Sequence, residues 1–136
     1  MTDRMEFARA VRPAHVGEAT RLRGEVRGWL AQLEADDDTR ERVLTAVSEA
    51  VDNAVEHAYP DGAEGTVELT LWVDADAINV SVVDHGAWHE GASPAEPGSH
   101  APRGRGFVLM HRSVDSVSIR HTDDGTVVAL RHHRDG

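Results

Sequence analysis

The segment SEAVDNAVEHAYPDG at residues 48–62 places three polar side chains, those of Glu49, Asn53 and His57, at intervals of four residues. On a helix that turns about 100° per residue, they lie within about 80° of one another at the border of a face rich in Ala and Val. A neutral amide oxygen beside a carboxylate suits Mg²⁺, a hard cation that keeps several waters and takes one or two protein oxygens. The alternative is a solvated helix edge, because polar residues normally flank an apolar face.

Two further motifs lie where a strand end or a glycine-rich turn would expose polar groups. Asp84 and Gly86 come directly after an apolar strand, so a carboxylate stands where a pocket can open and glycine lets a ligand approach the backbone. Gly104 and Gly106 of GRGF precede an expected helix, whose first N–H groups would be free to bind an anion such as phosphate. Taken alone, the first motif is also typical of a turn and the second of a hinge.

Hydrophobic periodicity and turn signals predict the elements that position these motifs. The expected elements are an edge strand at 5–11, helices at 16–33 and 39–58, a hairpin of 67–73 and 78–82, a short helix within 104–115, and a hairpin of 116–121 and 126–132. Asp38 and Glu41 are expected to form a capping box at the start of the second helix. This order predicts an α+β fold, a two-layer sandwich of a mostly antiparallel mixed sheet with helices on one face.

Residues 84–103 contain three glycines and three prolines and show no periodicity. A structureless stretch of this length in a compact domain is often a lid or a binding loop. His85 and His89 stand four residues apart within it and could bind a transition metal, but the loop offers no cysteine and no clear third ligand. Surface histidines are therefore the favoured interpretation.

The composition restricts the class of function. With 136 residues the chain is expected to form one domain, residues 1–136. It has no cysteine, no apolar run long enough to cross a bilayer and no secretion signal, so we expect a soluble cytoplasmic protein that does not bind membranes. The formal net charge of −10 argues against direct nucleic-acid binding. All 14 basic residues are arginines, which excludes a phosphate-binding loop built on lysine.

Read together and in order, four motifs resemble the GHKL ATP-binding superfamily, which includes the ATPase domains of gyrase, MutL and histidine kinases. They are similar to its N box, its two glycine boxes and its final Gly-Thr, at Glu49-x-x-x-Asn53, Asp84-x-Gly86, Gly104-x-Gly106 and Gly125-Thr126. The resemblance spans roughly residues 39–130. Within the superfamily, SEAVDNAVEHAY and RGRGFVLMHRSVD are most similar to the anti-sigma-factor serine/threonine kinases of the RsbW and SpoIIAB type.

This resemblance implies the Bergerat ATP-binding fold, with ATP and Mg²⁺ as cofactors and a lid at about residues 85–103. Asn53 would hold the Mg²⁺ that bridges the phosphates, and Glu49 would act as general base for the hydroxyl that attacks the γ-phosphate. His57 would lie near the phosphates. The apolar flank of the helix would partly bury Glu49 and raise its pKa towards neutrality, as suits a base.

The resemblance also implies how the nucleotide is bound. Asp84 would accept a hydrogen bond from the adenine amino group, with Thr126 supporting it from the neighbouring strand. Gly86 would let the backbone approach the ligand. The residues that line the phosphates would be Gly104, Arg105 and Gly106.

Three functions stay open for such a protein. The first is an anti-sigma-factor kinase that sequesters a sigma factor and phosphorylates a Ser or Thr of a STAS-domain antagonist, as a homodimer if it follows its relatives. The alternative is a module that captures a partner, with or without ATP, and transfers no phosphate. Trp88, which stands where the family commonly has a further glycine, favours this alternative, whereas Glu49 and Asn53 favour the kinase. A histidine-kinase catalytic domain would have to act on a separate chain, because 136 residues cannot also contain a phosphoacceptor hairpin.

Overall fold

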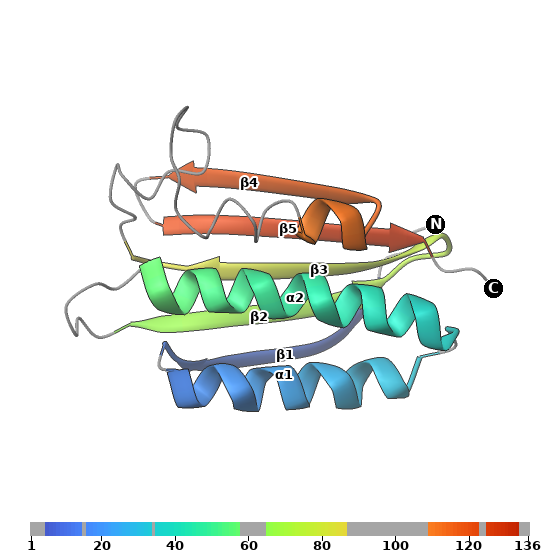
Figure 1. The fold of residues 1–136 in the computed structure, drawn as a ribbon, viewed down its shortest axis with the longest axis horizontal. Coiled ribbons are helices and arrows are strands. Elements are labelled where there is room, and N and C mark those ends of the chain that lie inside the picture. The colour runs from blue at the N-terminus through green and yellow to red at the C-terminus, as the bar shows by residue number, and fades with distance from the viewer. Residues whose placement is uncertain are drawn as a thin grey trace.

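The computed structural model describes residues 5–14, 16–33, 35–57, 65–86, 109–122 and 125–133. Within them, a sheet carries two helices on one face (Figure 1). The elements in chain order are β1 (Met5–Pro13), α1 (Val16–Ala31), α2 (Asp37–His57), β2 (Thr66–Val73), β3 (Ala77–Asp84), β4 (Ser116–Thr122) and β5 (Gly125–His133). Residues 109–113, between β3 and β4 in the chain, are also helical. In this part of the chain, no helix is long and apolar enough to span a membrane.

The strands form one sheet in the order β1-β2-β3-β5-β4, and every neighbouring pair is antiparallel. Because β1 and β4 are the edges, the chain leaves β3, crosses to the far edge and returns through β5 to pair with β3. This arrangement confirms the predicted α+β sandwich with helices on one face. Both predicted hairpins are present, and the predicted edge strand ends at Pro13.

The core lies between the two layers and follows the periodicity of each element. In β2, Val67, Leu69 and Leu71 are buried, whereas the residues between them are partly exposed. The buried apolar residues of α2 are Val43, Leu44, Ala46, Val47, Ala50, Val51 and Ala54. α2 packs on β2, β3 and β5, while α1 packs beside α2 and against β1 (Figure 1). Of the two helices, α2 therefore brings its polar border to the centre of the sheet.

Asp36 caps the first turn of α2. The backbone N–H of Thr39 donates to Asp36 Oδ1 at 2.8 Å, which makes Asp36 the N-cap of a helix that begins at the next residue. Hydrogen bonds from Thr39 lower the pKa of the Asp36 carboxyl. The predicted capping box of Asp38 and Glu41 is therefore wrong. Any of the three consecutive aspartates at 36–38 could serve as the N-cap by residue type, and Asp36 does so because it immediately precedes the first helical residue.

Arg40 joins the end of α1 to the start of α2. Its Nε donates to the carbonyl oxygen of Leu30 at 3.1 Å, and its Nη2 donates to that of Leu33 at 2.8 Å. Carbonyl groups at a helix end have no partner within the helix, so a side-chain donor stabilises them. These two hydrogen bonds of Arg40 help to hold α1 beside α2. α1 in turn carries Arg23, which belongs to the site described below.

Candidate functional site

The motif residues of the strand ends, Asp84, Gly86, Gly125 and Thr126, gather at one end of the molecule. Figure 1 shows the carboxyl-terminal ends of α2, β3 and β4 at the same end as the start of β5. In the strand register, Asp84 of β3 is opposite Thr126 of β5, and Thr126 is opposite His121 of β4. The candidate site is therefore built from three adjacent strands and the last turns of α2.

Asp84 presents a buried carboxylate at the end of β3. It lies on the helix-facing side of the strand, because it continues the alternate buried positions Ile78, Val80 and Val82. Its exposed fraction is 2%, and its Oδ1 accepts a hydrogen bond from the backbone N–H of Gly86 at 3.1 Å. An ionised carboxylate accepts hydrogen bonds and donates none, so this position suits a ligand with a donor group such as an exocyclic amine.

Gly125 allows β5 to begin directly against Asp84. Its φ is +140°, a backbone conformation that residues with a side chain rarely adopt. A Cβ atom at this position would lie 1.9 Å from the backbone oxygen of Asp84 and 2.7 Å from Cα of His85. The glycine of the Gly-Thr motif is therefore required by the close approach of two strands and not only by a turn.

Thr126 and His121 extend the same row of side chains across the sheet. Thr126 is 2% exposed, and its Oγ1 lies 3.0 Å from Nδ1 of His121. His121 itself is exposed on the edge strand β4. Sequence reasoning missed His121, although the last hairpin contained the signal, because residues 121 and 126 become neighbours once the hairpin register is known.

Glu49 and Asn53 lie on adjacent turns of α2, as their spacing predicted. Asn53 is 7% exposed, whereas Glu49 is partly buried. Burial raises the pKa of the Glu49 carboxyl, the nearby carboxylates of Asp52 and Glu56 raise it further, and the Arg23 guanidinium opposes them. The direction is the one expected from the apolar flank of the helix, and it gives Glu49 the character of a stronger base.

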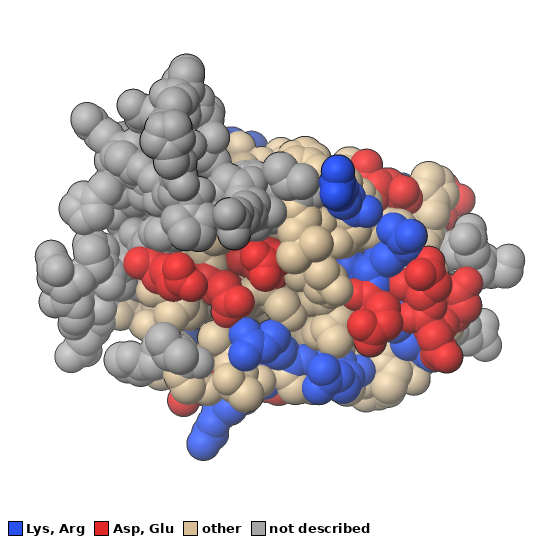
Figure 2. Space-filling model, viewed as in Figure 1, with Lys and Arg blue, Asp and Glu red and all other residues tan. Residues whose placement is uncertain are grey.

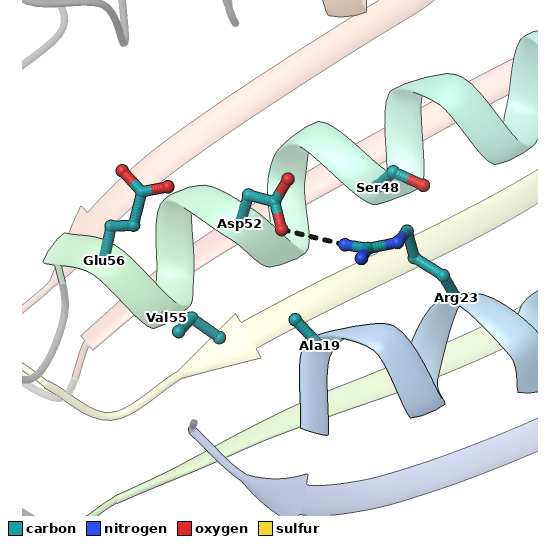
Figure 3. Close-up of a pocket in the computed structure, with 6 residues that line it drawn as sticks. All are labelled: Ala19, Arg23, Ser48, Asp52, Val55 and Glu56. Atoms are coloured by element: carbon teal, nitrogen blue, oxygen red, sulfur yellow. Dashed lines mark hydrogen bonds and ion pairs between the residues drawn. The ribbon is translucent and has the colours of Figure 1, made fainter. Parts of the chain in front are cut away.

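A pocket of about 270 Å³ opens between α1 and α2 (Figure 3). It is lined by Ala19, Arg23, Ser48, Asp52, Val55 and Glu56. Across it, Arg23 Nη1 of α1 lies 3.0 Å from Asp52 Oδ1 of α2, as the dashed line in Figure 3 marks. Residues 48, 52 and 56 form a row on α2 that is adjacent to the row of Glu49 and Asn53, because each precedes a member of that row by one position. The pocket therefore lies beside Glu49 and Asn53, on the side of α2 that faces α1. Sequence reasoning missed this ion pair, because nothing in the sequence connects residues 23 and 52.

Charge is distributed unevenly over this face. Figure 2 shows acidic side chains over the carboxyl-terminal half of α2, with arginines next to them over α1. Asp52 and Glu56 contribute two carboxylates to the pocket against the single guanidinium of Arg23. The wall beside Glu49 is therefore acidic overall, and the interhelical ion pair offsets part of its repulsion.

The remaining motif residues lie outside the described part of the chain. These are Gly104, Arg105 and Gly106, together with most of the expected lid, including Trp88 and His89. His57 belongs to α2, but its side chain is not described. The helix predicted after GRGF is confirmed at residues 109–113, where Met110 is fully buried. In the described ranges, no three His, Cys, Asp or Glu side chains are grouped to hold a metal ion.

An open antiparallel sheet covered on one face by helices is the fold of the histidine kinase-like ATPase domains. The family model of that description matches residues 11–132, so the chain belongs to this family. Its relatives include the "Anti-sigma F factor" of Anoxybacillus flavithermus, which is 30% identical over 115 residues, 79% of each chain. The protein of the same name from Bacillus subtilis is 29% identical over the same shares. These relatives confirm the anti-sigma-factor group that the sequence resembled.

The fold is also found in a crystal structure of the RsbU and RsbW domains of a Mycobacterium tuberculosis protein. The TM-score is 0.71 at 24% sequence identity, over 93% of this chain and 32% of that one. At this identity the likeness shows the fold alone.

Proposed function

We propose that this chain is an ATP-dependent protein kinase that sequesters a sigma factor and phosphorylates a Ser or Thr of a STAS-domain antagonist. Family membership supports the ATP site, and the similarity to proteins named anti-sigma F factor supports the sigma-factor partner. The observation that carries the proposal is the buried carboxylate of Asp84, held at a strand end opposite Thr126 and facing the helix layer. An ionised carboxylate accepts hydrogen bonds and donates none, so this position suits a donor group of a ligand.

Adenine fits this part of the site. Its exocyclic amine can donate a hydrogen bond to the Asp84 carboxylate. Thr126 lies beside Asp84 on the next strand. Gly86 already donates its N–H to one Asp84 oxygen, so the carboxylate is oriented before the base arrives. An oriented acceptor loses less freedom on binding, which favours affinity.

Asn53 fits a site for Mg²⁺ bound together with phosphates. It offers an amide oxygen one turn of α2 away from Glu49, and Mg²⁺ takes few protein oxygens when waters and phosphate oxygens are its other ligands. Such a site does not need three clustered acidic or histidine ligands. When bound, Mg²⁺ would neutralise charge on the phosphates during transfer.

Glu49 is the residue that would move the proton. The hydroxyl oxygen of the acceptor attacks the γ-phosphorus, the bond from that phosphorus to the bridging oxygen breaks, and ADP leaves with the bond pair. Glu49 takes the hydroxyl proton, a role for which its raised pKa is suited, because a base works best with a pKa close to the working pH. The acidic pocket beside it, with its ion pair between Arg23 and Asp52, is open to an approaching protein segment.

Calorimetric titration with ATP, in the presence and absence of Mg²⁺, tests the first part of the proposal. Glu49→Ala should still bind nucleotide, while phosphoryl transfer to an antagonist falls by about a hundredfold or more, the scale for losing a general base. Glu41→Ala is the matched control, since Glu41 is exposed near the other end of the same helix. Transfer at the parental rate by Glu49→Ala would show that the base is another group. Absence of transfer by the parent, with intact partner binding, would favour the partner-capture module.

A further inference from the structure

One row of side chains crosses three strands at the end of the sheet. Asp84, Thr126 and His121 occupy paired positions in β3, β5 and β4. All three lie on the helix-facing side, because they alternate in step with Val82, Val128 and Ile119, which belong to the core or pack against it. The nucleotide mechanism proposed above uses only the first two members of this row.

The contact between Thr126 and His121 restricts where the threonine hydroxyl can point. Oγ1 and Nδ1 are 3.0 Å apart, so one of the two atoms must donate. If Thr126 donates, its only proton is directed at the histidine and cannot reach a ligand. If Nδ1 carries the proton, His121 donates, and the hydroxyl proton of Thr126 is free to point elsewhere.

We propose that His121 donates from Nδ1 to Thr126 and thereby directs the threonine hydroxyl proton towards N1 of adenine. This inference rests on the proposed function, in which Asp84 accepts from the 6-amino group of the same base. Adenine presents a donor at its 6-amino group and an acceptor at the adjacent N1. Asp84 supplies the matching acceptor, and Thr126, one strand away, supplies the matching donor.

His121 is therefore a positioning residue that acts through Thr126. The purine preference of the site would rest on Asp84, because guanine presents a carbonyl oxygen where adenine presents its amine. That carbonyl oxygen would face the Asp84 carboxylate, an acceptor against an acceptor, whereas the Thr126 hydroxyl can donate or accept. Sites that hydrogen-bond a ligand group reject analogues that leave their buried polar groups unpaired.

A cycle of protein variants and nucleotide analogues tests this role. The dissociation constants of Mg²⁺-ATP and of Mg²⁺-1-deaza-ATP, in which C–H replaces N1, are measured by calorimetry for the parent and for His121→Phe. We expect His121→Phe to weaken ATP binding by about three- to tenfold, the range for one hydrogen bond, and to leave 1-deaza-ATP binding unchanged. Arg120→Ala is the matched control, because Arg120 is exposed next to His121 in β4 and points to the opposite face of the sheet. If His121→Phe weakens the binding of both nucleotides by the same factor, His121 has only a structural role and the inference is overturned.

The position of the histidine proton provides a second test that does not require nucleotide. Long-range ¹H–¹⁵N correlation spectra, recorded at about pH 8 where an ordinary histidine is neutral, report which ring nitrogen is protonated. The His121 signals are assigned by their loss in His121→Phe. We expect the proton on Nδ1, and a proton on Nε2 alone would overturn the inference whether or not ATP binds. If ATP fails to bind while Nδ1 is protonated, the proposed function fails and the donation to Thr126 stands.

Discussion

Gly125→Ala should damage both the fold and the candidate nucleotide site, because Gly125 holds β5 against the end of β3. The new Cβ atom would lie 1.9 Å from the backbone oxygen of Asp84, and a contact under 3.0 Å forces something to move. The neighbour is backbone and not a flexible side chain, so β5 and Asp84 must separate by about 1 Å. The φ of +140° adds strain for alanine.

The expected cost follows from these two effects. Backbone strain of this kind costs about 1–3 kcal/mol, and forcing an extra carbon into a packed region costs about 1–3 kcal/mol. The sum, about 2–6 kcal/mol, is a large part of the stability of a small domain. Denaturant titration should show this loss, and calorimetry should show ATP binding weakened by about tenfold or more, because displacement of Asp84 removes one hydrogen bond to a charged acceptor.

Gly24→Ala is the matched control for this substitution. Gly24 lies within α1, is exposed, and has no atom within 4 Å of the position that a Cβ would occupy. Alanine should therefore stabilise the helix by about 0.5–1 kcal/mol and leave ATP binding unchanged. Parental stability and parental ATP affinity in Gly125→Ala would refute the reasoning, because they would mean that the Gly-Thr motif is only a turn.

Two further predictions concern charge at Glu49. The raised pKa of Glu49 means that the folded state disfavours its ionised form, so the stability of the parent falls as the pH rises from about 4 through that pKa. Glu49→Gln should accordingly raise the Tm at pH 7 and have no such effect at pH 3, and equal Tm values at pH 7 would contradict the burial argument. Arg23→Gln should raise the pKa of Glu49 further, as followed by carboxyl NMR, while unfolding free energy changes by less than about 1 kcal/mol because the ion pair is partly exposed. An unchanged pKa would show that Arg23 acts only on Asp52.

Local sequence signals predicted the elements well, because each follows from periodicity within one segment. The helix carrying Glu49 and Asn53, both hairpins and the helix after GRGF appear close to their expected positions. The capping register was not predictable, since Asp36 and Asp38 are chemically equivalent and only the geometry of the first turn distinguishes them. Local patterns therefore fix where an element lies better than they fix its first residue.

Contacts between elements were beyond the reach of the sequence pattern. The ion pair of Arg23 and Asp52 depends on how α1 lies beside α2. Core packing and the hydrogen bonds from Arg40 to the end of α1 hold the two helices in that arrangement. His121 was missed for a related reason, because its contact with Thr126 depends on a strand register and on the identity of the residue opposite. Side chains of these kinds adjoin a candidate site whose principal residues were proposed from motifs.

The strand order explains why so many candidate residues meet at one end of the sheet. Since β5 inserts between β3 and β4, the hairpin that joins β4 to β5 falls beside the end of β3. The chain leaves β3 at Asp84 and returns to that neighbourhood at Gly125, so residues about forty positions apart become direct neighbours. A sequential meander would have placed β4 beside β3, and the Gly-Thr pair would then have been separated from Asp84 by another strand. The inserted strand thus brings the carboxylate of Asp84, which we propose binds adenine, into one row with the Thr126 hydroxyl and His121, next to the helix that carries Glu49.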